Sequence, residues 1–183
     1  MERSIGTDKL KVVIQTIDRA AQKADVKDLR IIICGGLATI AYGLQKRSTL
    51  DIDAEIDADF TIIEKLKKNI KFPAELTSDI SRWSMIDIPE GYRERAVPLN
   101  IVKTKNIKVF LLSPLDLIIS KLRVFRDKDI QDAVFLIKKF DIKKSDILKV
   151  SEEAIKQSPA STELLRFKKS LKYFLKLAYK DKP

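Results

Sequence analysis

Two aspartates that follow a pair of glycines are the residues most suited to chemistry in this chain. Asp51 and Asp53 lie in the segment "LDIDAEID", where apolar and acidic residues alternate as they do on a half-buried strand. Side chains two positions apart on a strand point to the same side, so the carboxylates repel unless a cation lies between them or one is protonated. Mg²⁺ or Mn²⁺ would relieve that repulsion. The pair therefore predicts a metal site suited to phosphoryl or nucleotidyl transfer, in which two metal ions clamp the attacking and leaving oxygens.

The glycine pair supplies a place for phosphates beside that site. Gly35 and Gly36 lie between the apolar run "RIIIC" and the helix-like segment "LATIAYG". A turn from a strand into a helix exposes backbone N–H groups, and the absence of side chains lets a phosphate come close. We expect the glycine turn to hold the far end of a triphosphate, with metal on Asp51 and Asp53 at its reacting end.

Each motif taken alone also has a structural interpretation. An acid-hydrophobe-acid triplet on an exposed strand and a Gly-Gly turn are both common in proteins that bind no nucleotide. Glu55 and Asp57 extend the acidic face, which indicates that the far end of this strand is solvated. The functional interpretation depends on the order of the parts: apolar strand, glycine pair, helix, polar loop and acidic strand.

The composition narrows the chemistry further. The chain has 183 residues, no histidine and one cysteine, Cys34. This excludes Ser-His-Asp and Cys-His catalysis, histidine zinc sites and an internal disulfide. The net charge of +10 favours a polyanionic partner such as RNA, DNA or a nucleotide, although a lysine-rich solvated surface would give the same charge.

The spacing of apolar residues predicts a mixed sheet with helices in the first part of the chain, a fold of the α/β (α+β) class. We expect this core to span residues 1–112. Its expected helices lie at residues 8–23, 37–43 and 62–70. Its expected strands lie at residues 29–34, 50–57, 80–88, 97–102 and 107–112.

A helical C-terminal segment over residues 113–183 is expected to pack on that core. Its first helix begins at "SPLD", where Ser113 can cap the helix and Pro114 suits the first turn. Three more helices are expected, over residues 127–140, 145–157 and 161–180.

Two longer motifs resemble the DNA polymerase β-type nucleotidyltransferase superfamily. The first is "GGLATIAYGLQKRSTLDID", and the second is the later helix motif "LSPLDLIISKLRVFRDKDIQD". Together they are most similar to the small branch that includes the AbiE-type toxins, over about residues 29–140. The string Arg47, Thr49, Asp51, Asp53 matches that branch, although the loop before Arg47 is one residue longer than usual.

The resemblance implies a nucleotide site with a third carboxylate on a later strand. Asp87 in "SMIDIP" is the residue we expect there, with Asp79 as the alternative; a turn-capping role for Asp87 is the structural interpretation. Arg47 would clamp triphosphate oxygens, unless it is simply an exposed loop arginine.

The later helix motif adds one cation and two acids. Lys121 lies off the apolar face of its helix, which by itself indicates a solvated position; the motif match implies a phosphate contact instead. Asp129 and Asp132 share one side of the next helix. They would orient Lys121 or Arg126, act as a base toward an acceptor hydroxyl, or form ordinary surface pairs.

These inferences predict a metal-dependent nucleotidyltransferase that uses Mg²⁺ or Mn²⁺. It would pass a nucleoside monophosphate from a nucleoside triphosphate to an RNA, especially tRNA, or to a protein. The resemblance also implies a cognate antitoxin as a partner. The alternative is a catalytically inactive module of the same fold that binds nucleic acid or a partner protein, and a weaker one is a scaffold whose last helix mediates oligomerisation. The sequence contains no stretch of about 20 apolar residues and no signal peptide, which predicts a cytoplasmic protein without a membrane partner.

Overall fold

The structure is a computed structural model that describes residues 4–180, and its elements form two compact groups. Of the described residues, the first group comprises the chain up to Ile80 together with Arg93–Leu112. The second group comprises Ser81–Tyr92 together with the chain from Ser113 onward. Two short helices lie where the chain passes between the groups: η2 (Ile80–Trp83) and α4 (Tyr92–Arg95).

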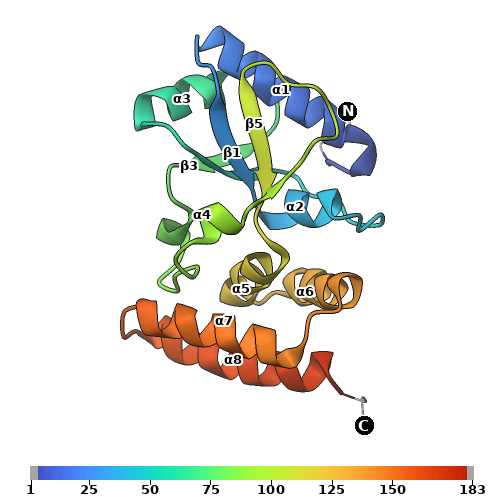
Figure 1. Ribbon diagram of the computed structural model, residues 1–183, viewed down its shortest axis with the longest axis vertical. Coiled ribbons are helices and arrows are strands. Elements are labelled where there is room, and N and C mark those ends of the chain that lie inside the picture. The colour runs from blue at the N-terminus through green and yellow to red at the C-terminus, as the bar shows by residue number, and fades with distance from the viewer. Residues whose placement is uncertain (1–3, 181–183) are drawn as a thin grey trace. The chain divides into compact units, whose positions relative to one another are not determined.

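The first group is a mixed α/β unit built on one five-stranded sheet, which confirms the expected fold class. The strand order is β3-β2-β1-β5-β4, and β1 runs antiparallel to β2. β1 and β5 run parallel, as their arrows show in Figure 1. The elements of this group are η1 (Thr7–Lys9), α1 (Leu10–Lys23), β1 (Leu29–Ile33), α2 (Gly35–Ala41), β2 (Ile52–Ile56), α3 (Phe60–Asn69), β3 (Ala74–Thr77), β4 (Val97–Pro98) and β5 (Ile107–Leu111).

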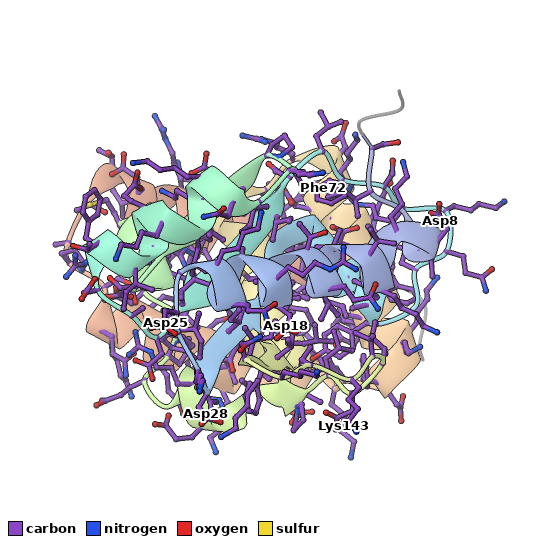
Figure 2. All side chains as sticks on the ribbon, turned by 90° about the horizontal axis from the view of Figure 1, so that it is seen from above. Asp8, Asp18, Asp25, Asp28, Phe72 and Lys143 are labelled. Carbon is purple, nitrogen blue, oxygen red and sulfur yellow. The ribbon has the colours of Figure 1, made fainter. Side chains whose placement is uncertain are left out.

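One face of this sheet forms the apolar core of the first group. Ile31, Ile52 and Ile56 are completely buried on it, together with the predicted apolar side of α1. Figure 2 shows α1 and α3 side by side across the sheet, with Asp8 and Asp25 near the two ends of α1. Midway along α1, Asp18 accepts hydrogen bonds from the backbone N–H groups of Lys105 and Asn106, so the loop before β5 is fixed to this helix.

The opposite face of the sheet carries the polar side chains. In register, β1 and β2 place Ile32 beside Glu55, and β2 and β3 place Asp53 beside Glu75. Since side chains alternate along a strand, Arg30, Asp53, Glu55 and Glu75 all belong to this face. The candidate chemistry is therefore on the face opposite α1 and α3.

The strand expected over residues 80–88 does not form. Residues 80–83 make the 3₁₀ helix η2, and residues 84–89 have no regular structure. Ser84 donates its N–H to the carbonyl of Ser81, and its own hydroxyl accepts from the N–H of Ile86. These local hydrogen bonds replace a strand ladder, which is a common effect of serine side chains.

The edges of the sheet also differ from expectation. β3 is not among the expected strands; it follows Pro73 and pairs in parallel with β2. The strand expected over residues 97–102 is reduced to β4, which lies at the edge of the sheet, where a proline without an N–H is tolerated.

The second group is helical, as predicted for the end of the chain. Ser113 caps α5, since its hydroxyl accepts a hydrogen bond from the N–H of Asp116, and Pro114 occupies the first turn. The helices are α5 (Pro114–Val124), α6 (Asp127–Phe140), α7 (Lys144–Gln157) and α8 (Thr162–Ala178), drawn from yellow-brown to red in Figure 1. Nowhere in residues 4–180 is a helix both long and apolar enough to cross a membrane.

Candidate functional site

The glycine turn and Asp53 are in direct contact. Cys34, the last residue before the turn, donates its N–H to the carbonyl of Asp53 at 2.9 Å. Gly35 has φ +60°, and a Cβ atom added to it would lie 1.8 Å from Oδ2 of Asp53. The Asp53 carboxylate therefore occupies the space that any side chain at position 35 would need. Only glycine fits both the backbone conformation and the carboxylate.

Asp51 reaches the same turn through Thr49. The Thr49 hydroxyl donates to Oδ1 of Asp51 at 2.7 Å, and a Cβ atom on Gly36 would lie 3.1 Å from the same hydroxyl. Nη2 of Arg47 is equally close to that position on Gly36, and Nη1 of Arg47 donates to the carbonyl of Ser48. The structure thus brings together six of the predicted residues around one turn: Gly35, Gly36, Arg47, Thr49, Asp51 and Asp53.

The two aspartates fit a magnesium ion that is shared with a substrate. Within residues 4–180, no group of three or more acidic or cysteine side chains is close enough to hold a metal ion by itself. Mg²⁺ is typically held by one or two carboxylates, with waters and substrate phosphates as its other ligands. Asp51 and Asp53 provide such a pair. Because α2 has only seven residues, the approach allowed by the glycines matters more than the dipole of this helix.

A third acid on the sheet, Glu75, is one that the sequence reasoning missed. Glu75 is the register partner of Asp53 on the adjacent parallel strand β3, so the two side chains lie on the same face of the sheet. It is exposed. The four-residue strand "AELT" is short, but its apolar-polar alternation directly after a proline is a signal that could have identified it.

The strand that led to the choice of Asp87 does not exist. Asp87 lies in the irregular segment after η2, within the second compact group, and its backbone N–H donates to the hydroxyl of Ser158 at 2.8 Å. The expectation that Asp87 lies on a sheet strand was therefore wrong. Its alternative, Asp79, lies in the first group and faces Nη2 of Arg93 at 3.9 Å.

The far end of the acidic strand is not solvated as expected, because Glu55 is only 4% exposed. Its Oε1 accepts from Nε of Arg93 at 2.6 Å, and its Oε2 accepts from the N–H of Ile80 at 2.9 Å. Asp57, by contrast, is exposed as predicted. Glu55 is thus a buried structural acid that joins β2 to two later segments of the chain.

Lys121 is buried between two acids of the second group. It is 4% exposed, and its ammonium group lies 2.7 Å from Oδ2 of Asp132 and 3.3 Å from Oδ1 of Asp129. Asp129 also accepts from the N–H of Arg126. The two acids therefore orient Lys121, which is one of the roles expected for them, whereas a solvated Lys121 is ruled out.

One comparison with known proteins identifies the family. Over residues 8–176 the sequence matches the family described as "Nucleotidyltransferase of unknown function (DUF6036)". The chain belongs to this family. The DUF6036 match includes all the site residues discussed above, and it confirms the resemblance to nucleotidyltransferases at the level of the family. No curated protein and no solved structure matches the chain.

Proposed function

We propose that this DUF6036 protein is a metal-dependent nucleotidyltransferase that moves a nucleoside monophosphate from a nucleoside triphosphate to an acceptor oxygen. The observation that supports it most is the contact between Asp53 and Gly35, together with the Thr49–Asp51 hydrogen bond beside Gly36. The Asp53 carboxylate thus lies against a turn that has no side chains, and Thr49 links Asp51 to the same turn. A phosphate chain can then bind the turn while its reacting end meets the carboxylates.

In the proposed reaction the acceptor oxygen attacks the α-phosphorus. The bond from that phosphorus to the oxygen of the β-phosphate breaks, and pyrophosphate leaves in line with the attacking oxygen. Asp51 and Asp53 hold the metal, and Mg²⁺ bound there supplies positive charge against the phosphate oxygens. Arg47, beside Gly36, adds a cation for the outer phosphates.

A carboxylate near Asp53 would take the proton that the acceptor hydroxyl loses. The position of Glu75 beside Asp53 favours it for this role. Asp87 stays a prediction for the same role without the strand that motivated it. Comparing Glu75→Gln with Asp87→Asn tests the choice: the variant that lacks the true base shows the larger loss of kcat.

RNA is the acceptor class that the surface charge supports. Exposed cations on α8 include Lys169, Lys172 and Lys176, and phosphate backbones bind such clusters electrostatically. The AbiE-like resemblance adds a second part of the proposal, namely that the transfer inactivates an RNA, tRNA above all, and is restrained by a cognate antitoxin protein.

The decisive experiment incubates the protein with each α-labelled nucleoside triphosphate, Mg²⁺ and total cellular RNA. We expect label to enter RNA, EDTA to abolish the transfer, and Asp53→Asn to lower its rate by about 100-fold or more. Asp25→Asn is the matched control. Asp25 is an exposed aspartate of the same group with φ 56°, a conformation that asparagine tolerates, so its rate should not change.

The outcome separates the proposal from its alternative. Wild-type protein that binds RNA but incorporates no label from any triphosphate, with or without added protein acceptors, would identify a non-catalytic binding module. An Asp53→Asn variant that keeps the full rate would remove the proposed role of the acidic pair.

A further inference from the structure

The polar face of the sheet carries a pocket that contains none of the residues to which the proposed transfer assigns a role. It lies entirely within the first compact group and has a volume of about 210 Å³. It is lined by Arg30, Ile32, Glu55, Asp57, Ser78 and Arg93.

Arg30 is the unusual member of this pocket. Its guanidinium group lies over the Phe110 ring, with its carbon 4.0 Å from the ring centroid, and Nη2 donates to the carbonyl of Arg93. Its Nε–H is buried and has no hydrogen-bond partner among residues 4–180. In the part of the chain that the structure describes, Arg30 also forms no ion pair with a carboxylate. A buried donor without an acceptor is costly, so a ligand oxygen at this position would be stabilised.

The other charges of the pocket leave the Arg30 cation uncompensated. Glu55 and Arg93 neutralise each other at 2.6 Å. Asp57 is exposed, so water screens its repulsion toward an anion in the pocket. Arginine presents two parallel donors that match the geometry of a carboxylate or a phosphate. The chemistry of the pocket therefore suits an oxyanion.

The pocket lies on the opposite side of Asp53 from the glycine turn. Gly35 contacts Asp53 at the start of β2, whereas Asp57, after the end of β2, donates its N–H to the carbonyl of Arg30. At about 3.3 Å per residue, the pocket begins about 7 Å beyond Asp53 at Glu55 and extends to about 13 Å at Asp57. An in-line displacement requires the attacking oxygen to lie opposite the leaving pyrophosphate. With pyrophosphate at the glycine turn, the attacking molecule comes from the side of this pocket.

We propose that the Arg30 pocket is the acceptor subsite and that it binds an oxyanion, a phosphate or a carboxylate, that the acceptor carries near its attacking hydroxyl. This assignment rests on the proposed nucleotidyl transfer for the direction of attack. The oxyanion site itself rests only on the pocket and on Arg30.

The test of the oxyanion site observes Arg30 directly and requires no catalysis. The Nε–Hε signals of the ¹⁵N-labelled full-length protein are recorded during separate titrations with inorganic phosphate and with acetate, without nucleotide or metal. The Arg30 signal is the one that disappears in Arg30→Lys. We expect it to shift saturably with one of the two anions, and the anion that saturates it distinguishes a phosphate-bearing acceptor from a carboxylate-bearing one.

A second variant tests whether the pocket prefers anions, by removing a negative charge at its edge. Asp57→Asn removes a negative charge from the edge of the pocket and should tighten anion binding about 2- to 5-fold, the range expected for an exposed charge pair. Asp25→Asn, outside the pocket, should leave the affinity unchanged. A linear shift without saturation, or weaker binding in Asp57→Asn, would overturn the oxyanion site.

The acceptor role is tested separately. With a non-hydrolysable triphosphate and Mg²⁺ present, the anion should still bind at Arg30. In the transfer assay, Arg30→Gln should raise KM for the acceptor at least 10-fold and leave KM for the triphosphate unchanged. Competition between triphosphate and anion at Arg30 would instead make the pocket part of the donor site and overturn the acceptor role. Saturable binding at Arg30 in a protein that transfers no nucleotide would keep the oxyanion site and remove both the acceptor role and the proposed function.

Discussion

At the scale of single residues, the conformation of Gly35 connects stability to the candidate chemistry. Its positive φ and the nearby Asp53 carboxylate each exclude a side chain. Gly36, the next residue, has an ordinary backbone conformation and faces the flexible end of Arg47 and the side chain of Thr49 at 3.1 Å. The two neighbouring glycines should therefore respond differently to the same substitution.

We predict that Gly35→Ala lowers the free energy of unfolding by about 1–3 kcal/mol from backbone strain alone, with a further loss as the Asp53 carboxylate is displaced. Gly36→Ala should cost less, because Arg47 can move aside. Urea unfolding of both variants measures the difference. Equal losses for the two would show that the strain at Gly35 is not what distinguishes them.

The residues that could be predicted are those whose roles depend on short spacings. The glycine pair, Asp51 and Asp53 all lie in one stretch of sequence whose pattern predicts the site, and the structure brings them together. The burial of Glu55 could not be predicted in that way, since its partner Arg93 is 38 residues away. The place of Glu75 beside Asp53 likewise depends on a strand pairing that no local pattern reveals.

At the scale of the elements, the buried charges of α5 and α6 hold the two helices together. Lys121 on α5 contacts both Asp129 and Asp132 of α6, and Lys121 and Asp132 are almost completely buried. Removing one partner of such a cluster leaves buried charge without compensation, and that is more harmful than replacing the whole cluster with apolar side chains.

We predict that Lys121→Met destabilises the fold by about 3–5 kcal/mol, because it leaves two acids without their cation. Lys128→Met, an exposed position at the start of α6, is the control and should change stability by no more than about 0.5 kcal/mol. Chemical denaturation measures both variants. A loss for Lys121→Met as small as that of the control would mean that water reaches the acids in the folded protein.

Elements with long periodic patterns were predictable, and short irregular ones were not. The six apolar positions of α1 and the start of α5 at Ser113 follow from local rules of helix formation. Residues 80–88 also have a strand-like composition, and Ile80, Ile86 and Ile88 are indeed buried. They were nevertheless misassigned, because serine hydrogen bonds and packing with distant helices fold this segment without a ladder.

At the scale of the whole molecule, the excess positive charge has a candidate location. The exposed residues of α8 include Arg166, Lys168, Lys169, Lys172 and Lys176, with Tyr173 59% exposed among them. Basic side chains interleaved with an exposed aromatic ring suit a single-stranded nucleic acid.

We predict that replacing Lys169, Lys172 and Lys176 by Gln weakens RNA binding by at least 10-fold. The slope of the logarithm of the RNA-binding constant against the logarithm of the salt concentration should also become less steep by about 2. For single strands, each lost phosphate contact reduces the magnitude of this slope by about 0.7. The matched control replaces three exposed lysines on and after α3, Lys65, Lys68 and Lys71, with the same change in net charge. Equal losses in both variants would show that binding follows net charge and not α8.

The division of the chain into two groups could not be predicted from composition. Ser81–Tyr92 groups with the late helices although sheet elements precede and follow it in the sequence. Its hydrogen bonds to Ser158 and Gln157 of the second group span 71 and 67 residues, respectively. No linker-like stretch separates the groups, so only the three-dimensional contacts reveal that the chain passes between them three times.

The short backbone bridge near the start of the chain has a practical consequence. Ile5 is completely buried and exchanges two hydrogen bonds with Thr49, at 2.7 and 3.0 Å, and Thr49 in turn holds Asp51. A protease that trims a few terminal residues, or an affinity tag that disturbs them, would therefore loosen an acid more than forty positions away. Assays of this protein are best made with the tag on the other end.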